Sequence, residues 1–139
     1  MRVVADTNTI VSGLLWKAAP RALLDAARDG QIALYTSAAL LAELALVLPR
    51  AKFAKRVAAS GMSTERLVRR YATLARRIVP ADINPVVIAD ADDDAVLACA
   101  LAANAEIIVS GDAHLRNLKT WHGIRILSTT ATIALIART

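Results

Sequence analysis

Four acidic side chains from separate parts of the chain have residue types that suit metal chemistry: Asp6, Glu43, Asp94 and Asp112. If the fold gathers them, their carboxylates repel one another and some pKa values rise, unless a cation shares the site. Carboxylate oxygens suit Mg²⁺ or Mn²⁺, whereas a single Cys and two His argue against zinc. Bound Mg²⁺ takes phosphate oxygens and can activate water, so such a cluster indicates phosphodiester hydrolysis.

Two of these acids follow predicted strands. Asp6 comes directly after the apolar run 2–5, and Asp112 comes shortly after the apolar run 107–109. A carboxylate placed directly after a buried strand is costly without partners, so folding alone explains Asp6 poorly. Asp112 also has a structural explanation, because an Asp after a turn can cap the next helix.

The other two acids belong to predicted helices. Asp94 begins, or lies one turn inside, a helix that reaches residue 103, where an acid also favours the helix dipole. Glu43 lies about one and a half turns into a helix at 38–48, from where its side chain can reach back to the edge of a sheet. Because ligands bind at the carboxyl edge of an open parallel sheet, we expect all four acids to meet there.

Strands and helices alternate along the whole chain, which predicts one domain over residues 1–139. The expected architecture is a three-layer α/β/α sandwich with a central, mainly parallel sheet. The remaining predicted elements are a loop running into a helix at 7–16, helices at 20–28, from 63 to about 79 and from 130, strands at 32–36 and 124–127, an extended segment at 86–88 and an acidic turn at 90–94.

The net charge of +5 and a pI near 10.0 are typical of a protein that meets a polyanion, although a solvated basic surface explains them as well. The basic side chains that follow the Glu43 helix are candidates to contact the phosphates of a nucleic acid in a groove leading to the acids: Arg50, Lys52, Lys55 and Arg56. Trp16 is either a core residue or a surface for base stacking, and His114 either assists substrate binding or is a surface side chain.

Cys99, in an apolar run, is the single cysteine and is expected to be buried rather than reactive. The absence of a disulfide, of a signal peptide and of a long apolar segment predicts a soluble, cytoplasmic protein with no membrane partner.

Four short segments together resemble the PIN-domain family in order and spacing. They are residues 3–8, 36–43, 90–100 and 108–112. More narrowly, the chain resembles the toxin components of bacterial toxin–antitoxin pairs, described as VapC-like. The resemblance covers essentially the whole chain and implies Mg²⁺- or Mn²⁺-dependent cleavage of RNA. It also implies a homodimer that is held inactive by a small antitoxin protein.

The resemblance further implies roles for individual residues. Asp6, Glu43 and Asp94 would form the core acidic triad, with Asp112 as the fourth acid. Asn8 and Ser110 match polar positions that orient the acids or contact metal-bound water. Asp93 is the reserve for Asp94, because the acidic run offers several candidates for one role.

Two other functions compete with a nuclease. A phosphatase of the haloacid dehalogenase type also begins with a strand followed by Asp-x-Asp-x-Thr, but here Asn8 replaces the second Asp and no acid shortly follows Asp112. Labelling for an aspartyl-phosphate intermediate would separate the two. The second competitor is a non-catalytic module that binds RNA or an antitoxin, and it predicts no metal binding.

Overall fold

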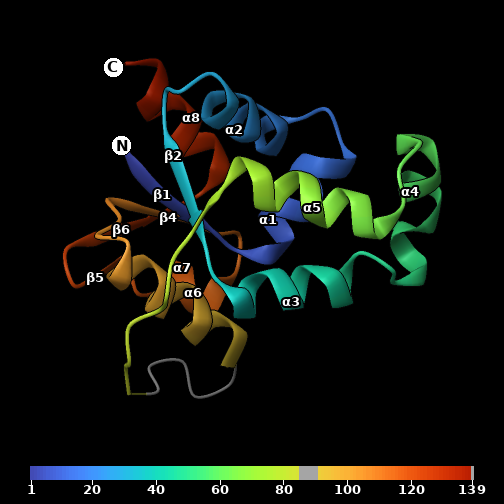
Figure 1. Cartoon of the computed structure of the whole chain (residues 1–139). Helices are drawn as coiled ribbons and strands as arrows, with labels where there is room; N and C mark the ends of the chain where they lie inside the picture. Colours follow the sequence, from blue (N-terminus) through green and yellow to red (C-terminus); the bar gives the residue numbers. More distant parts are fainter. Residues whose placement is uncertain (85–90, 139) are drawn as a thin grey trace.

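The computed structural model describes residues 1–84 and 91–138 (Figure 1). The predicted extended segment 86–88 and Asp90 lie outside the described residues. In chain order the elements are β1 (Arg2–Ala5), α1 (Thr7–Leu15), α2 (Ala19–Arg28), β2 (Ala33–Thr36), α3 (Ala38–Val47), the 3₁₀ helix η1 (Ala51–Phe53), α4 (Ala54–Ser60), α5 (Thr64–Leu74), β3 (Arg76–Arg77), α6 (Ala91–Ala102), β4 (Ile107–Val109), α7 (Ala113–Arg116), β5 (Thr120–Trp121), β6 (Ile124–Leu127) and α8 (Thr129–Ala137).

The described strands form one sheet in the order β3-β2-β1-β4-β6-β5, with β1 and β4 near its centre. All neighbouring pairs are parallel except β5 and β6, which are antiparallel. Ala5 of β1 pairs in register with Val109 of β4, so the residues that follow these two strands are neighbours at one edge. The predicted mainly parallel sheet is confirmed.

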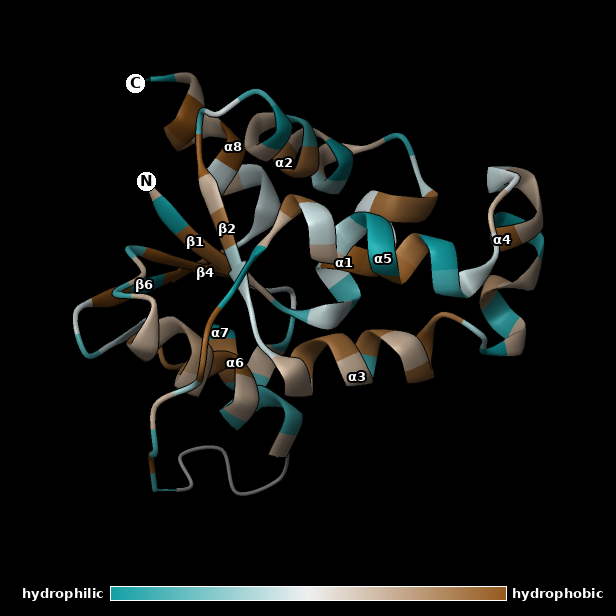
Figure 2. Ribbon diagram, viewed as in Figure 1, coloured by the Kyte–Doolittle hydropathy of each residue, from teal (hydrophilic) through white to brown (hydrophobic). Residues whose placement is uncertain are grey.

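Side chains of the central strands alternate between two apolar cores. Val3 packs into a core with α1, α2, α5 and α8, whereas Val4 packs into a second core with α6 and α7. Figure 2 shows these strands in brown at the centre of the molecule, with helices on both sides. Burial on both faces explains why the strands are continuous apolar runs, and the predicted three-layer α/β/α architecture is confirmed.

The structure differs from the prediction between β1 and β2. Residues 7–15 form α1 directly after the strand, instead of a loop that runs into a helix. The reason is Asp6, whose Oδ1 accepts a hydrogen bond of 2.9 Å from the backbone N–H of Thr9 and so caps the helix.

A second difference concerns the helix predicted from residue 63 to about 79. It ends at Leu74, and Arg76 and Arg77 form β3, which pairs with Tyr35 and Thr36 of β2. Backbone pairing at the edge of the sheet therefore overrides the helical pattern of this segment. The short elements α7 and β5 are also absent from the prediction.

Within the described residues, no helix combines the length and the apolar character that a membrane span requires.

Candidate active site

Asp6 is held at the junction of β1 and α1. Its backbone N–H donates to Val109 O at 3.0 Å, which continues the pairing of β1 with β4. Its Oδ1 caps α1, and its Oδ2 accepts a 2.5 Å hydrogen bond from Ser110 Oγ. The side chain is only 7% exposed, so these bonds fix the direction of a buried carboxylate.

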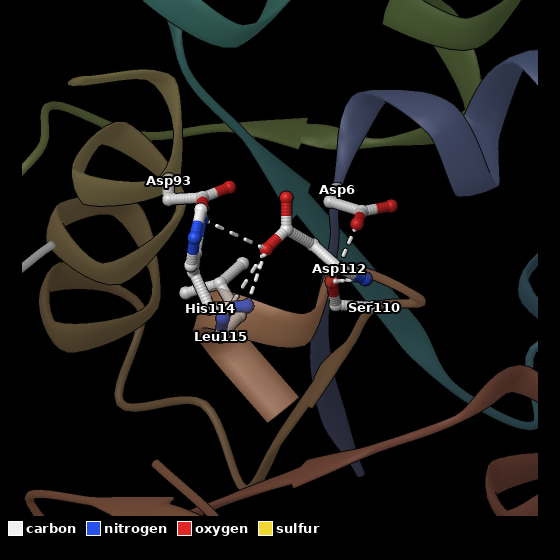
Figure 3. A network of polar contacts seen from close by, with 6 residues as sticks. All are labelled: Asp6, Asp93, Ser110, Asp112, His114 and Leu115. Carbon is white, nitrogen blue, oxygen red and sulfur yellow. Dashed lines mark hydrogen bonds and ion pairs between the residues drawn. The ribbon is translucent and has the colours of Figure 1, made fainter. Parts of the chain in front are cut away.

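Ser110 links Asp6 to Asp112. The Ser110 hydroxyl donates to Asp6 and accepts from the backbone N–H of Asp112 at 2.9 Å (Figure 3). Asp112 is the N-cap of α7, and its Oδ1 accepts from the backbone N–H of His114 at 2.7 Å. The two predicted roles of Asp112, a helix cap and a member of the acidic cluster, are therefore compatible, since it caps α7 and also lies beside Asp6.

Glu43 reaches the same place from α3. Ser37 caps this helix and accepts from the backbone N–H of Leu40 at 3.3 Å. Glu43 then lies one and a half turns into the helix, half-buried, and its Oε1 accepts a hydrogen bond from Thr7 Oγ1 at the start of α1. This bond joins two helices that follow different strands of the sheet.

The acidic end of α6 contributes Asp93. Its side chain is 6% exposed and lies with Asp6, Glu43 and Asp112 in one cavity, whereas Asp94 does not line that cavity. Asp94 is the ligand that the family pattern predicts, with Asp93 as the reserve, but Asp93 is the one of the two that lines the cavity.

Helical spacing explains why Asp93, and not Asp94, lines the cavity. Adjacent residues of an α-helix point about 100° apart, and side chains three, four and seven positions apart share a face. Val96, Leu97 and Ala100 are fully buried, and they lie at these distances from Asp93. Counting from the buried residues of the helix, rather than from the family pattern, would have selected Asp93.

The acids surround a cavity of about 60 Å³, which has room for an ion and a few water molecules. It is lined by Asp6, Thr7, Asn8, Glu43, Asp92, Asp93, Val96 and Asp112. Among these described residues none is basic and Val96 alone is apolar. The structure thus brings three of the four preferred acids to one cavity, with Asp93 in the place of Asp94, and their role as metal ligands stays a prediction.

His114 lies beside Asp93 and Asp112 (Figure 3). Its Nδ1 lies 3.7 Å from Asp112 Oδ1 and 4.0 Å from Asp93 Oδ2, and its side chain is 57% exposed. Asp93, Asp112 and His114 each offer one ligand atom, and these atoms all lie within 4.8 Å of one another. The position of His114 two residues after Asp112, in a helix that this acid caps, is the sequence signal that could have added it to the candidate site.

The donor set fits a divalent metal. It consists of carboxylate oxygens, with a Thr hydroxyl, an Asn amide and one imidazole nearby, and such hard ligands suit Mg²⁺ or Mn²⁺ better than zinc. A cation would also remove the mutual repulsion of carboxylates that share a small cavity.

The predicted RNA-binding residues do not line the acidic cavity. Arg50, Lys52, Lys55 and Arg56 belong to η1, α4 and the residue before them, at the far end of α3 from the acids (Figure 1). Arg56 lines a different cleft instead.

A mainly parallel sheet with an acidic cavity at the carboxyl ends of β1 and β4 is compatible with a metal-dependent nuclease domain. A profile of the PIN domain matches residues 2–114, and the chain belongs to the PIN-domain family. Comparison with curated proteins and with solved structures gave no match. PIN domains are generally metal-dependent nucleases that use divalent ions, and the acidic cluster found here could bind such a metal.

Proposed function

We propose that the protein is a ribonuclease that hydrolyses RNA phosphodiester bonds with Mg²⁺ or Mn²⁺. The observation that carries the proposal is the acidic cavity, because five acids from four separate segments share about 60 Å³ with no basic side chain among the described residues that line it. A solvated surface does not require this convergence, and a cluster of this kind repels phosphate unless a cation is present.

Asp6, Asp93 and Asp112 are the residues that would hold the ion, with Glu43 on the same cavity wall and His114 close to Asp93 and Asp112. When bound, the metal supplies an activated water and charge neutralisation for the phosphate. The protein orients the ligands: Ser110 fixes the Asp6 carboxylate, and Thr7 fixes that of Glu43. Asn8, exposed at the cavity wall, can bond a phosphate or a water.

The choice of RNA and the toxin role extend this proposal. They are supported by the spacing of the four motifs, which resembles toxins of toxin–antitoxin pairs, and by the net charge of +5. In this role the protein acts in the cytoplasm, and a small antitoxin keeps it inactive. Inducible expression of the wild type should arrest growth, and expression of Asp6→Asn should not. Mapping the new RNA ends after arrest would identify the target.

Self-association is part of the same proposal. One face of α3 is apolar yet exposed, with Ala42, Ala45 and Leu46 on it, and Leu46 is 75% exposed. An unpaired apolar stripe of this kind is typical of a contact surface, and a second copy of the chain is the partner that the resemblance implies.

The direct test is cleavage of a labelled RNA by the purified chain with EDTA, Mg²⁺ or Mn²⁺. We expect cleavage with the metals only, and a loss of at least about 100-fold in Asp6→Asn and Asp93→Asn. Asp29→Asn is the matched control, because Asp29 is an exposed acid outside the cavity. Calorimetry that finds no Mn²⁺ binding to the wild type would overturn the proposal in favour of a non-catalytic binding module.

A further inference from the structure

A cleft unrelated to the acids opens at the last turn of α1. It measures about 580 Å³ and lies between the end of α1, the start of α2, α4 and α5. It shares Leu14, Arg21 and Arg70 with a neighbouring hollow of about 650 Å³. We call it the basic cleft, after the cationic side chains on its wall: Lys17, Arg21, Arg56 and Arg70. None of the described residues that line it is acidic.

The cations of the basic cleft have different tasks. The Arg21 guanidinium donates to the carbonyl oxygens of Gly13 at 2.5 Å and of Leu14 at 3.0 Å, so it closes the end of α1 and is partly buried. Lys17, Arg56 and Arg70 are exposed, and no hydrogen bond or ion pair of their side chains is found among the described residues. They are therefore available to a ligand.

The basic cleft also holds a flat ring. The Arg56 guanidinium lies 5.1 Å from the centre of the Trp16 ring, and Trp16 meets Phe53 edge to face at 6.1 Å. Leu15 and Leu67 line the same cleft. An aromatic platform beside apolar side chains, with cations around it, matches a nucleotide, whose base stacks while its phosphate meets positive charge.

Positive charge continues outside the basic cleft. Nine of the 17 Lys and Arg of the chain lie between residues 50 and 77, and Glu65 is the only acid in that segment. All nine are exposed: Arg50, Lys52, Lys55, Arg56, Arg66, Arg69, Arg70, Arg76 and Arg77. Figure 2 shows hydrophilic residues in teal along α4 and α5. This stretch is long enough to meet several phosphates.

We propose that the basic cleft binds single-stranded RNA away from the acids, with a base stacked near Trp16 and phosphates on Arg56 and Arg70. The proposal rests on the proposed nuclease function. An acidic peptide could also pair with the cations, but its carboxylates cannot stack on the aromatic ring. RNA can make both contacts and therefore fits the cleft better. Single strands are required because stacking on a side chain needs an unpaired base.

The two sites lie at opposite ends of one helix. Thr7 and Asn8, in the first turn of α1, line the acidic cavity, and Leu15 lines the basic cleft at the last. A helix of nine residues is about 13 Å long, so an RNA that spans both sites must be several nucleotides long.

Trp16 makes the proposal testable without catalysis. The chain has two Trp, so Trp121→Phe leaves Trp16 as the only indole emitter. We would titrate the full chain carrying Asp6→Asn and Trp121→Phe, in EDTA, with an unlabelled uridine dodecamer, and follow Trp16 emission. A fluorescein-labelled dodecamer in a parallel titration reports binding by anisotropy. We expect saturable quenching, with an affinity that falls steeply with salt.

Arg56→Gln with Arg70→Gln should weaken binding at least about fivefold and lower the salt slope by about 1.4, the value for two lost phosphate contacts to a single strand. Arg125→Gln with Arg138→Gln is the control, because both are exposed outside the basic cleft and the net charge changes equally. Equal weakening by both pairs, or anisotropy without a change in Trp16 emission, would overturn the proposal. Equal quenching by a polyglutamate peptide would assign the cleft to an acidic protein instead. Because no metal or cleavage is involved, these outcomes are independent of whether the wild type proves to be a nuclease.

Discussion

Ser110 Oγ donates a 2.5 Å hydrogen bond to Asp6 Oδ2, and this bond joins the carboxyl ends of the adjacent strands β4 and β1. Both side chains are buried, so the bond sets the position of Asp6 more firmly than a surface contact could. Two of the three residues proposed to hold the ion depend on this edge, because Asp6 directly follows β1 and Asp112 lies three residues after β4.

Replacing Ser110 by Ala should loosen Asp6. The buried carboxylate oxygen would lose its donor, at a cost of about 1–3 kcal/mol in the free energy of unfolding, measured by urea titration in EDTA. Mn²⁺ affinity, measured by calorimetry, should fall about tenfold. Ser63→Ala, which removes the cap of α5, a helix that does not line the acidic cavity, should lower stability without changing Mn²⁺ affinity. Unchanged affinity in Ser110→Ala would show that the bond does not orient a ligand.

Two replacements of Asp6 should separate its structural role from its chemical one. Asn can still cap α1 through its carbonyl oxygen, whereas Ala cannot, so Asp6→Ala should be about 0.5–2 kcal/mol less stable than Asp6→Asn. Both should lose metal-dependent cleavage. If Asp6→Asn retained cleavage, a cap would be the only role of Asp6.

The choice between Asp93 and Asp94 is open to a paired test. Asp93→Asn should reduce Mn²⁺ affinity at least about tenfold, because Asp93 lines the acidic cavity and Asp94 does not. Asp94→Asn is the matched control in the next position of the same helix, and it should leave the affinity within about a factor of two. The reverse result would restore the preference drawn from the family pattern.

Alkaline pH should destabilise the fold through Cys99 and Tyr71. Burial raises the pKa of the Cys99 thiol from 9.0 to about 12, and burial, with a smaller effect of Cys99, raises the pKa of the Tyr71 phenol. For a group whose pKa is higher in the folded state, the stabilisation is complete below the unfolded pKa and is lost as pH rises toward the folded one.

The free energy of unfolding should therefore fall above about pH 9, by up to about 1.4 kcal/mol per pH unit for the thiol. Urea titrations at pH 8, 9 and 10 measure this slope, and Cys99→Ala should reduce it. A wild-type slope that persists in Cys99→Ala would show that the thiol titrates normally.

Self-association should depend on Leu46. Leu46→Glu places a charge on the exposed apolar face of α3, so the mass measured by sedimentation should fall to that of a monomer while the melting temperature stays within a few degrees. Val79→Glu is the control, since Val79 is 84% exposed on a different segment. A wild type that is already monomeric at high concentration would remove the homodimer from the proposal.

The central sheet could be predicted because its strands are short apolar runs, and the helices α2, α3 and α8 could be predicted from their caps, breakers and spacing. The start of α1 at Thr7 differs from the predicted loop because the Asp6 carboxylate caps the helix, and the spacing of apolar residues does not show such a cap. The end of α5 at Leu74 could not be predicted from local sequence, because it depends on the long-range pairing of Arg76 with Tyr35.

The candidate site was predictable in its position and less so in its members. Placement of Asp6 and Asp112 after strands suffices to bring them together, because parallel pairing aligns those ends. To choose Asp93, one has to count which residues of α6 share its buried face. To include His114, one has to predict α7, and this helix of four residues is too short to show a periodic pattern. Residues from α1, α2, α4 and α5 line the basic cleft together, so no single segment of the sequence predicts it.

Asp6 and Asp112 each cap a helix with one carboxylate oxygen, and both also line the acidic cavity. Each of these side chains therefore serves two purposes, since it fixes where a helix begins and supplies an acid to the candidate site. A substitution that removes either carboxylate would disturb a helix start together with the cavity, so loss of function at these positions has to be separated from loss of stability.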